Sequence, residues 1–203
     1  MQKIYILSVV LLLNHLSVRG ETPALMVDLN PDKPELSQGK IVRTNEKFFL
    51  GMGSKGVITS KKRFKDGYSM TGDFRVVALL AKDKFEMTDK LLQKSKRSRE
   101  YLQTHLFINM NRIDFNGDGK AGEYGDAYIA LWPVDDTSGH HFGFHPHKGV
   151  YRYYGYAIHG AEDESKIGRK STGGCLNLVK DDLLRLLKEL RLGSLVRIKS
   201  TKG

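Results

Sequence analysis

The chain has 203 residues and carries 33 Lys and Arg against 23 Asp and Glu, which gives a formal net charge of +10. This length suits one domain with a sizeable core. The positive charge favours contact with an anionic cell wall or membrane surface, because no nucleic-acid-binding motif accompanies it. The chain has one cysteine, which excludes an internal disulfide and leaves one thiol free.

The first 20 residues have the pattern of a secretory signal peptide. Lys3 precedes a short apolar run, Ile4 to Leu13, and small residues near Gly20 provide a cleavage site. The run is too short to span a bilayer comfortably, although an uncleaved anchor is the alternative. We therefore expect export to the periplasm or cell wall. A thiol kept free in an oxidising compartment suggests that the thiol has a use.

Residues 21–38 are rich in Pro, Asp and Glu and are predicted to form an extended leader before a domain that covers residues 39–203. That domain begins with short β-prone runs between glycines. The runs are Lys40-Ile-Val-Arg, Lys47-Phe-Phe-Leu, Gly56-Val-Ile-Thr and Phe74-Arg-Val-Val-Ala-Leu-Leu.

Residues 88–147 are predicted to be an insertion in this domain. Thr88 to Gln103 is helix-like and strongly basic, which is typical either of a wall-binding face or, more simply, of a solvated helix face. Two further strands are expected, Leu106-Phe-Ile-Asn-Met and Tyr128-Ile-Ala-Leu-Trp.

The end of the chain has the pattern of one amphipathic helix and one strand. Asp181 or Asp182 is expected to cap the helix, a row of leucines forms its apolar face, and Gly193 is placed to end it. The last strand is Ser194-Leu-Val-Arg-Ile-Lys. The predicted fold class is therefore mainly β with few helices, a β-rich α+β fold.

A candidate catalytic pair lies between the tyrosine-rich run Val150 to Ile158 and this helix. His159 precedes Cys175 by sixteen residues, and Gly173 and Gly174 come directly before the cysteine. A nucleophilic thiol needs a base to take its proton and backbone N–H groups to hold the oxyanion. The pattern indicates a Cys-His acyl-transfer site, and the alternative is a buried structural cysteine with an unrelated histidine.

Two other motifs could hold metals. Asp114-Phe-Asn116-Gly-Asp118-Gly119-Lys120-Ala-Gly-Glu123 resembles the start of a calcium loop, with Gly125 at the position where a Glu is expected, so Glu123 or Asp126 would have to substitute. The alternative is an Asn-Gly or Asp-Gly turn. The histidine-rich segment 140–147 could bind zinc, line a substrate cleft, or form an exposed strand. No cofactor is expected to be required.

The stretch around Cys175 resembles the L,D-transpeptidase catalytic domain, the YkuD-type fold of bacterial cell-wall enzymes. The family signature is His-Gly, a loop, and then Ser/Thr-His-Gly-Cys, a hydrophobic residue and Asn or Arg. Here it appears as His159-Gly160 and then Thr172-Gly173-Gly174-Cys175-Leu176-Asn177. Two departures are Gly173 in place of the family's second histidine and Met70 in place of a strand proline. The resemblance covers roughly residues 39–203 and implies a β-sandwich or barrel with a catalytic cysteine loop.

The resemblance also implies roles for individual residues. His159 would take the proton of Cys175, the Gly160 carbonyl would orient the imidazole, and the N–H groups of Gly174 and Cys175 would form the oxyanion hole. Residues expected at the substrate are Thr172, Gly173, Asn177 and Tyr156.

The implied activity is transfer of an acyl group from a peptidoglycan stem peptide through a cysteine thioester. Three alternatives remain open: an L,D-carboxypeptidase that trims the same peptides, a non-catalytic wall-binding module, and a toxin with this chemistry that acts on a rival's cell wall. The oligomeric state is not predicted.

Overall fold

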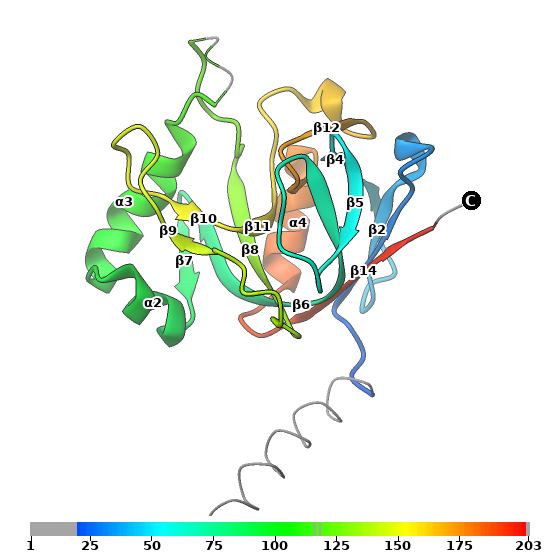
Figure 1. The fold of residues 1–203 in the computed structure, drawn as a ribbon, viewed down its shortest axis with the longest axis horizontal. Helices are drawn as coiled ribbons and strands as arrows, with labels where there is room; N and C mark the ends of the chain where they lie inside the picture. The colour runs from blue at the N-terminus through cyan, green and yellow to red at the C-terminus, as the bar shows by residue number, and fades with distance from the viewer. Residues whose placement is uncertain (1–19, 116, 118, 202–203) are drawn as a thin grey trace, which may run out of the picture.

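The computed structural model describes residues 20–115, 117 and 119–201, and its centre is one large curled sheet (Figure 1). Nearly all of the expected signal peptide therefore lies outside the described residues. The sheet has ten strands, eight of them in the order β13-β11-β8-β6-β14-β1-β2-β3, and β5 and β7 pair with β6. Its strands are β1 (Leu25–Leu29), β2 (Gln38–Ile41), β3 (Lys47–Phe49), β5 (Gly56–Thr59), β6 (Tyr68–Ala81), β7 (Lys84–Met87), β8 (Ala127–Pro133), β11 (Tyr156–His159), β13 (Leu176–Asn177) and β14 (Leu195–Ser200).

The long strand β6 organises this sheet. Its first half pairs with β5 and β14, and its second half pairs with β7 and β8. The register with β8 shifts between Val76 and Ala78, and such an irregularity bends a strand and increases its twist. Two small ribbons complete the β structure: β4 (Met52–Gly53) with β12 (Lys170–Thr172), and β9 (Gly143–Phe144) with β10 (Tyr153–Tyr154).

Helices cover the sheet at two places and bury two hydrophobic cores. α4 (Lys180–Glu189) packs Leu183, Leu186 and Leu187 into the first core, as expected for apolar residues at helical spacing. The second core lies under α2 (Asp89–Ser95) and α3 (Arg99–Asn111). Two short 3-10 helices, η1 (Pro34–Leu36) and η2 (Glu164–Lys166), lie in loops. The predicted fold class is confirmed.

The segment 21–38 is not a separate leader, which corrects the sequence prediction. β1 pairs in parallel with β14 and antiparallel with β2, so this segment supplies an inner strand of the sheet. Leu25, Val27 and Leu29 alternate with more exposed residues and are fully buried. This is the period-2 pattern of a strand, and the Pro and acidic residues on both sides of it obscured the signal.

Two further predictions about the region 88–147 were wrong. Leu106 to Met110 belongs to α3 rather than to a strand, because Leu102, Leu106 and Met110 recur at helical spacing and are all buried. The region is also not wholly an insertion, since β8 lies inside the main sheet between β6 and β11. The predicted strand at 128–132 is confirmed as part of β8.

One cation of the basic segment, Lys94 in α2, bonds to the segment that follows β8. Lys94 Nζ donates a hydrogen bond to the Phe142 carbonyl at 2.6 Å and lies 5.0 Å from the centre of a Trp132 ring.

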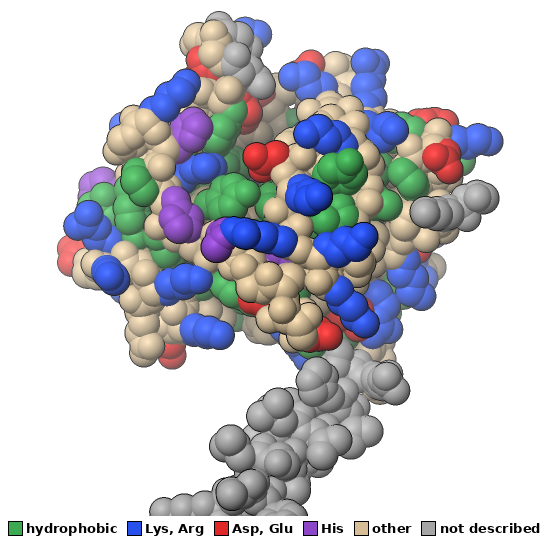
Figure 2. Space-filling view, in the orientation of Figure 1, with side chains coloured by type: hydrophobic (Ala, Val, Ile, Leu, Met, Phe, Trp, Pro, Cys, Tyr) green, Lys and Arg blue, Asp and Glu red, His purple; other side chains and the backbone are tan. Residues whose placement is uncertain are grey.

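Figure 2 shows Lys and Arg side chains spread over much of the viewed face. In the part of the chain that the structure describes, no helix combines the length and the apolar character needed to cross a membrane.

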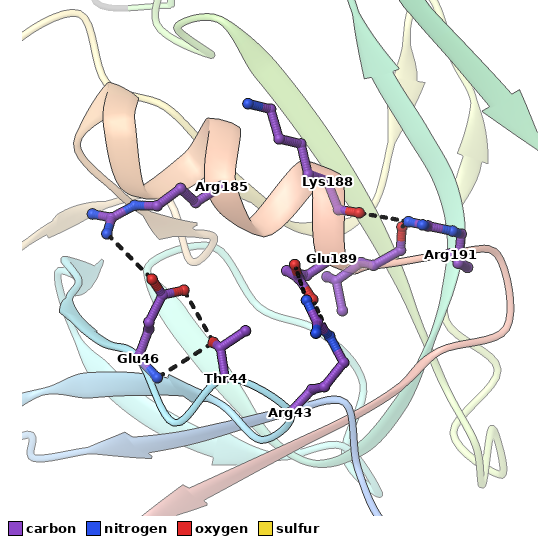
Figure 3. Close-up of polar contacts among 8 residues, drawn as sticks. Arg43, Thr44, Glu46, Arg185, Lys188, Glu189 and Arg191 are labelled. Carbon is purple, nitrogen blue, oxygen red and sulfur yellow. Dashed lines mark hydrogen bonds and ion pairs between the residues drawn. The ribbon is translucent and has the colours of Figure 1, made fainter.

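Surface ion pairs tie α4 to the turn between β2 and β3 (Figure 3). Arg43 makes two hydrogen bonds with the Glu189 carboxylate, at 2.6 and 2.8 Å, and Glu46 lies 3.9 Å from Arg185. Exposed ion pairs of this kind fix the orientation of the helix more than they add stability.

The predicted cap of α4 was wrong. Val179 is the N-cap residue, and Asp181 and Asp182 lie in the first turn, where negative charges interact favourably with the helix dipole.

Candidate active site

Two adjacent parallel strands bring His159 and Cys175 together. Ile158 pairs with Leu176 and His159 pairs with Asn177. Cys175 therefore lies beside Ala157, two positions before His159. Side chains alternate along strands, and therefore both residues project on the same face of the sheet. Both line a cleft of about 450 Å³.

The His159 ring is held in one orientation. Its Nδ1 lies 2.6 Å from the Gly160 carbonyl oxygen, so Nδ1–H donates there and Nε2 keeps its lone pair. The Tyr128 ring stacks on the imidazole at 6.0 Å, and the Tyr124 ring meets it edge-on at 4.9 Å. The hydrogen bond to Gly160 is the one that the family resemblance implies.

Gly160 is a glycine because another piece of backbone crosses it. A Cβ at Gly160 would lie 2.8 Å from the Cα of Gly125, and the Gly160 N–H donates to the Tyr124 carbonyl at 2.9 Å. The segment that ends at Gly125 therefore packs directly behind the histidine.

Burial keeps the two reactive groups neutral near pH 7. It lowers the pKa of His159 to about 4, an effect that the Gly160 carbonyl partly offsets. It raises the pKa of Cys175 to about 12, and the Ala157 N–H and the charge of Arg152 partly offset this rise. The thiol donates a long hydrogen bond, 3.7 Å, to the Gly155 carbonyl. The site thus holds a thiol and a neutral imidazole rather than an ion pair.

Hydrogen bonds hold the cysteine loop from within and from the neighbouring segments. The Thr172 hydroxyl donates to the Cys175 carbonyl at 2.6 Å and accepts from the Gly174 N–H at 3.1 Å. From outside the loop, the Ser69 hydroxyl donates to the Gly174 carbonyl at 2.7 Å, and the Gly67 N–H donates to the Gly173 carbonyl at 2.7 Å. The loop is therefore preorganised by partners about 100 residues away in sequence.

Gly174 has a conformation that only glycine adopts easily. Its φ is +131°, and a Cβ there would lie 2.8 Å from both the Phe64 ring and the Tyr68 carbonyl oxygen. The expected oxyanion role of its N–H needs correction, because that N–H is bonded to Thr172 in this structure. Within the described residues, the Cys175 N–H has no protein acceptor.

The other residues expected at the substrate divide into two groups. Thr172, Gly173 and Asn177 line the cleft. Tyr156 does not: it is fully buried, its hydroxyl donates to the Met70 carbonyl at 3.0 Å, and its ring packs on Phe74. A substrate contact by Tyr156 was therefore a wrong prediction. The reason is strand alternation, because Tyr156 and His159 project on opposite faces of β11.

The predicted calcium loop lies beside the cleft, and the structure describes part of it. The Asp114 carboxylate accepts hydrogen bonds from the Gly117 and Gly119 N–H groups, at 2.6 and 2.9 Å. Glu123 accepts from the Phe115 N–H at 3.0 Å, and Lys120 lies 3.8 Å from Glu162. The other two residues of the predicted set, Asn116 and Asp118, lie outside the described residues, so calcium binding stays a prediction.

The imidazoles of the histidine-rich segment do not form a metal-binding cluster. His140 is buried, whereas His141 and His145 are exposed. Across residues 20–115, 117 and 119–201, no group of three or more His, Cys, Asp or Glu side chains is arranged to hold a metal.

Most of the cleft wall could not be assigned from the sequence. Phe64, Tyr124, Arg152 and Tyr154 all line the cleft, but their sequence neighbours carry no family motif. Only the density of tyrosine before His159 gave a signal, and it could not tell which tyrosines face the cleft.

Comparisons with known proteins identify a family for this chain. The profile of the YkuD family, described as the L,D-transpeptidase catalytic domain, matches residues 24–198. No curated protein matches the chain. Similar solved structures include an L,D-transpeptidase from Mycobacterium smegmatis, at 11% identity and a TM-score of 0.43, with 87% of this chain and 59% of that chain covered.

A second similar structure is L,D-transpeptidase 3 from Mycobacterium tuberculosis in complex with a faropenem-derived adduct. It is 12% identical, with a TM-score of 0.44 and coverage of 87% of this chain and 60% of that one. The chain thus spans about three-fifths of the length of these solved chains. Because the family profile matches most of its length, the chain belongs to the YkuD family of L,D-transpeptidase catalytic domains.

Proposed function

We propose that this chain is an L,D-transpeptidase that transfers peptidoglycan stem peptides through a thioester on Cys175. One observation carries the proposal. Cys175, directly before β13, and His159, at the end of β11, both line one cleft, and the Gly160 carbonyl fixes the imidazole with Nε2 available as a base.

The first half of the reaction forms the thioester. His159 Nε2 takes the proton of the thiol as Cys175 Sγ bonds to the peptide carbonyl carbon. The tetrahedral intermediate then breaks its C–N bond, and the amine of the D-residue leaves with the proton held by His159. In the second half, an acceptor amine attacks the thioester, its proton passes to His159, and the thiol is restored.

The Cys175 N–H is the donor that the cysteine loop leaves for the oxyanion. It lies in a loop braced by Thr172 and Ser69, so little reorganisation is needed when negative charge develops. In other acyl-transfer enzymes one such donor lowers the barrier by about 3 kcal/mol.

A second candidate activity is hydrolysis of the same thioester, which would make the chain an L,D-carboxypeptidase. Gly173 favours it, because this exposed residue stands where the family carries a histidine. A Cβ at Gly173 would meet no atom within 4 Å. The open space beside the nucleophile gives water access to the acyl-enzyme.

Export to the periplasm or cell wall is part of this proposal. It is supported by the signal-peptide pattern of residues 1–20 and by the net charge of +10, which suits contact with an anionic wall or membrane surface.

Product analysis by mass spectrometry tests the activity and separates the two outcomes. Defined tetrapeptide muropeptides are incubated with the protein, with and without a D-amino acid as acceptor. Exchanged or cross-linked products are expected from a transpeptidase, and loss of the terminal D-residue alone from a carboxypeptidase. Cys175→Ala should abolish either product, and unchanged muropeptides with the unaltered protein would contradict the proposal.

A further inference from the structure

Arg152 occupies the wall of the cleft that contains Cys175. Its guanidinium carbon lies 5.4 Å from the centre of the Phe115 ring and 5.2 Å from the centre of the Tyr154 ring. Both aromatic residues also line the cleft. Cation–π contacts with the two rings help to hold the guanidinium in place.

Arg152 has no carboxylate partner among the described residues, whereas two arginines of the main sheet do. Arg75 and Arg197 each make two hydrogen bonds to one carboxylate, Arg75 to Glu21 and Arg197 to Asp73. The Nε of Arg152 is buried and has no hydrogen-bond partner. A buried N–H group of a cation is costly when it lacks an acceptor, so an acceptor from outside the chain is indicated.

The charges that line the cleft limit where an anionic acceptor can bind. The cleft is also lined by acidic side chains, which repel an anionic peptide, and among the described residues Lys166 is the other Lys or Arg that lines it. Arg152 is near enough to Cys175 for its charge to lower the pKa of the thiol. A substrate carboxylate bound here would therefore lie close to the reacting atoms. The acidic residues are Asp66, Glu123, Glu162 and Asp163.

We infer that Arg152 determines specificity by binding a carboxylate of the substrate peptide beside the bond that Cys175 attacks. The inference rests on the proposed function and adds the group that is recognised. A guanidinium presents N–H groups in a planar fork that matches a carboxylate. Two substrate carboxylates fit this chemistry. One is the terminal carboxylate of the D-residue, and the other is a side-chain carboxylate of the residue with the L-centre, whose carbonyl Cys175 attacks.

Equilibrium binding to the Cys175→Ala protein tests the inference without requiring turnover. Calorimetry compares three tetrapeptides: one with both carboxylates, one amidated at the terminus, and one amidated at the L-centre side chain. We expect one amide to bind at least about tenfold more weakly than the diacid, as for loss of a hydrogen bond between charged groups. The amide that weakens identifies the carboxylate.

Arg152→Gln, added to the Cys175→Ala protein, should remove that difference, and Arg152→Lys should restore part of it. Arg97→Gln is the matched control, because the Arg97 guanidinium also lies over two rings, those of Tyr101 and Tyr151, at 5.3 and 5.5 Å, but outside the cleft. The ratio of acid to amide affinity should stay unchanged in this control. Thermal melts of each variant verify that it is folded.

Equal weakening of all three peptides by Arg152→Gln, with the acid-to-amide ratio preserved, would show that Arg152 only supports the fold and would overturn the inference. Absence of binding by every peptide would overturn it too. If the peptides bind with the expected discrimination but the unaltered protein makes no product from them, the proposed transpeptidase activity fails and the carboxylate site stands.

Discussion

At the scale of single residues, the protonation states of Cys175 and His159 decide how the site works. A thiol whose pKa is raised to about 12 and an imidazole whose pKa is lowered to about 4 are both neutral over most of the working range of pH. In the proposed mechanism the imidazole would accept the thiol proton only during attack, which is general-base catalysis.

This assignment predicts the pH dependence of kcat/KM. Below a pH of about 4 His159 is protonated and cannot act as a base, so kcat/KM should fall there with an apparent pKa of about 4. Above this limb it should stay level to pH 9, because the thiol remains protonated. Initial rates with a tetrapeptide across this range measure the profile. A second, descending limb near pH 8 would instead indicate a thiolate–imidazolium pair.

Gly173 and Gly174 are neighbours with opposite tolerance to substitution. Gly174→Ala places a Cβ at 2.8 Å from Phe64 and from a backbone oxygen, in a left-handed conformation, and should cost about 2 kcal/mol or more of unfolding free energy. Gly173→Ala meets no atom within 4 Å and should leave the melting temperature nearly unchanged. Thermal denaturation of the two variants makes the comparison. Equal destabilisation would show that the loop is not packed as described.

At the scale of elements, the loop between β5 and β6 forms a wall of the cleft, and buried His140 supports it. The His140 Nδ1 accepts the Phe64 N–H at 3.1 Å, and its Nε2 lies 3.0 Å from the Ser60 carbonyl oxygen and 2.7 Å from the Ser138 hydroxyl. The same loop carries Phe64 over Gly174. His140 therefore positions the wall without touching the nucleophile.

His140→Ala should loosen this wall. It leaves the Phe64 N–H without its acceptor and removes a buried ring that stacks on Phe142 at 4.9 Å. We expect a loss of about 2 kcal/mol of unfolding free energy and a lower kcat/KM, measured by denaturant titration and steady-state kinetics. The exposed neighbour is the control, and His141→Ala should change neither quantity. If His140→Ala matches that control, the loop is held by other contacts.

Sequence patterns predicted the elements whose periodicity is local. The β-prone runs were sufficient to predict β6 and β8, the leucine spacing was sufficient to predict α4, and the His159 to Cys175 motif was sufficient to predict the family. α3 was partly misassigned because a short, mainly apolar run such as residues 106–110 fits either a helix or a strand. The walls of the cleft could not be predicted from the sequence. Contacts such as that between Phe64 and Gly174 join residues more than 100 positions apart and depend on the complete sheet.

At the scale of the whole molecule, the sheet depends on a strand from the beginning of the described chain. β1 lies between β14 and β2, and β14 in turn pairs with β6. The β1 side chains Leu25, Val27 and Leu29 lie in the same core as Leu176, which follows Cys175. Loss of β1 would therefore affect the sheet that carries the site.

Truncations from the N-terminus test this dependence. A chain that begins at Gly20 should fold with a cooperative melt, whereas a chain that begins at Asn30 lacks β1 and should not. The physical reason is that β14 and β2 would each lose a partner strand and buried leucines would be missing from the core. Circular dichroism during heating gives the comparison. Cooperative melting of both chains would show that β1 is dispensable.

The most direct test of the account is intact-protein mass spectrometry after rapid acid quenching of a reaction with a stem tetrapeptide. Catalysis by the Cys175 thiol predicts a covalent adduct with the mass of the peptide acyl group that remains after loss of the D-residue, located on Cys175 by proteolysis and absent from Cys175→Ala. His159→Gln should slow its appearance. Cross-linked or trimmed products formed at full rate by Cys175→Ala would contradict catalysis by this thiol.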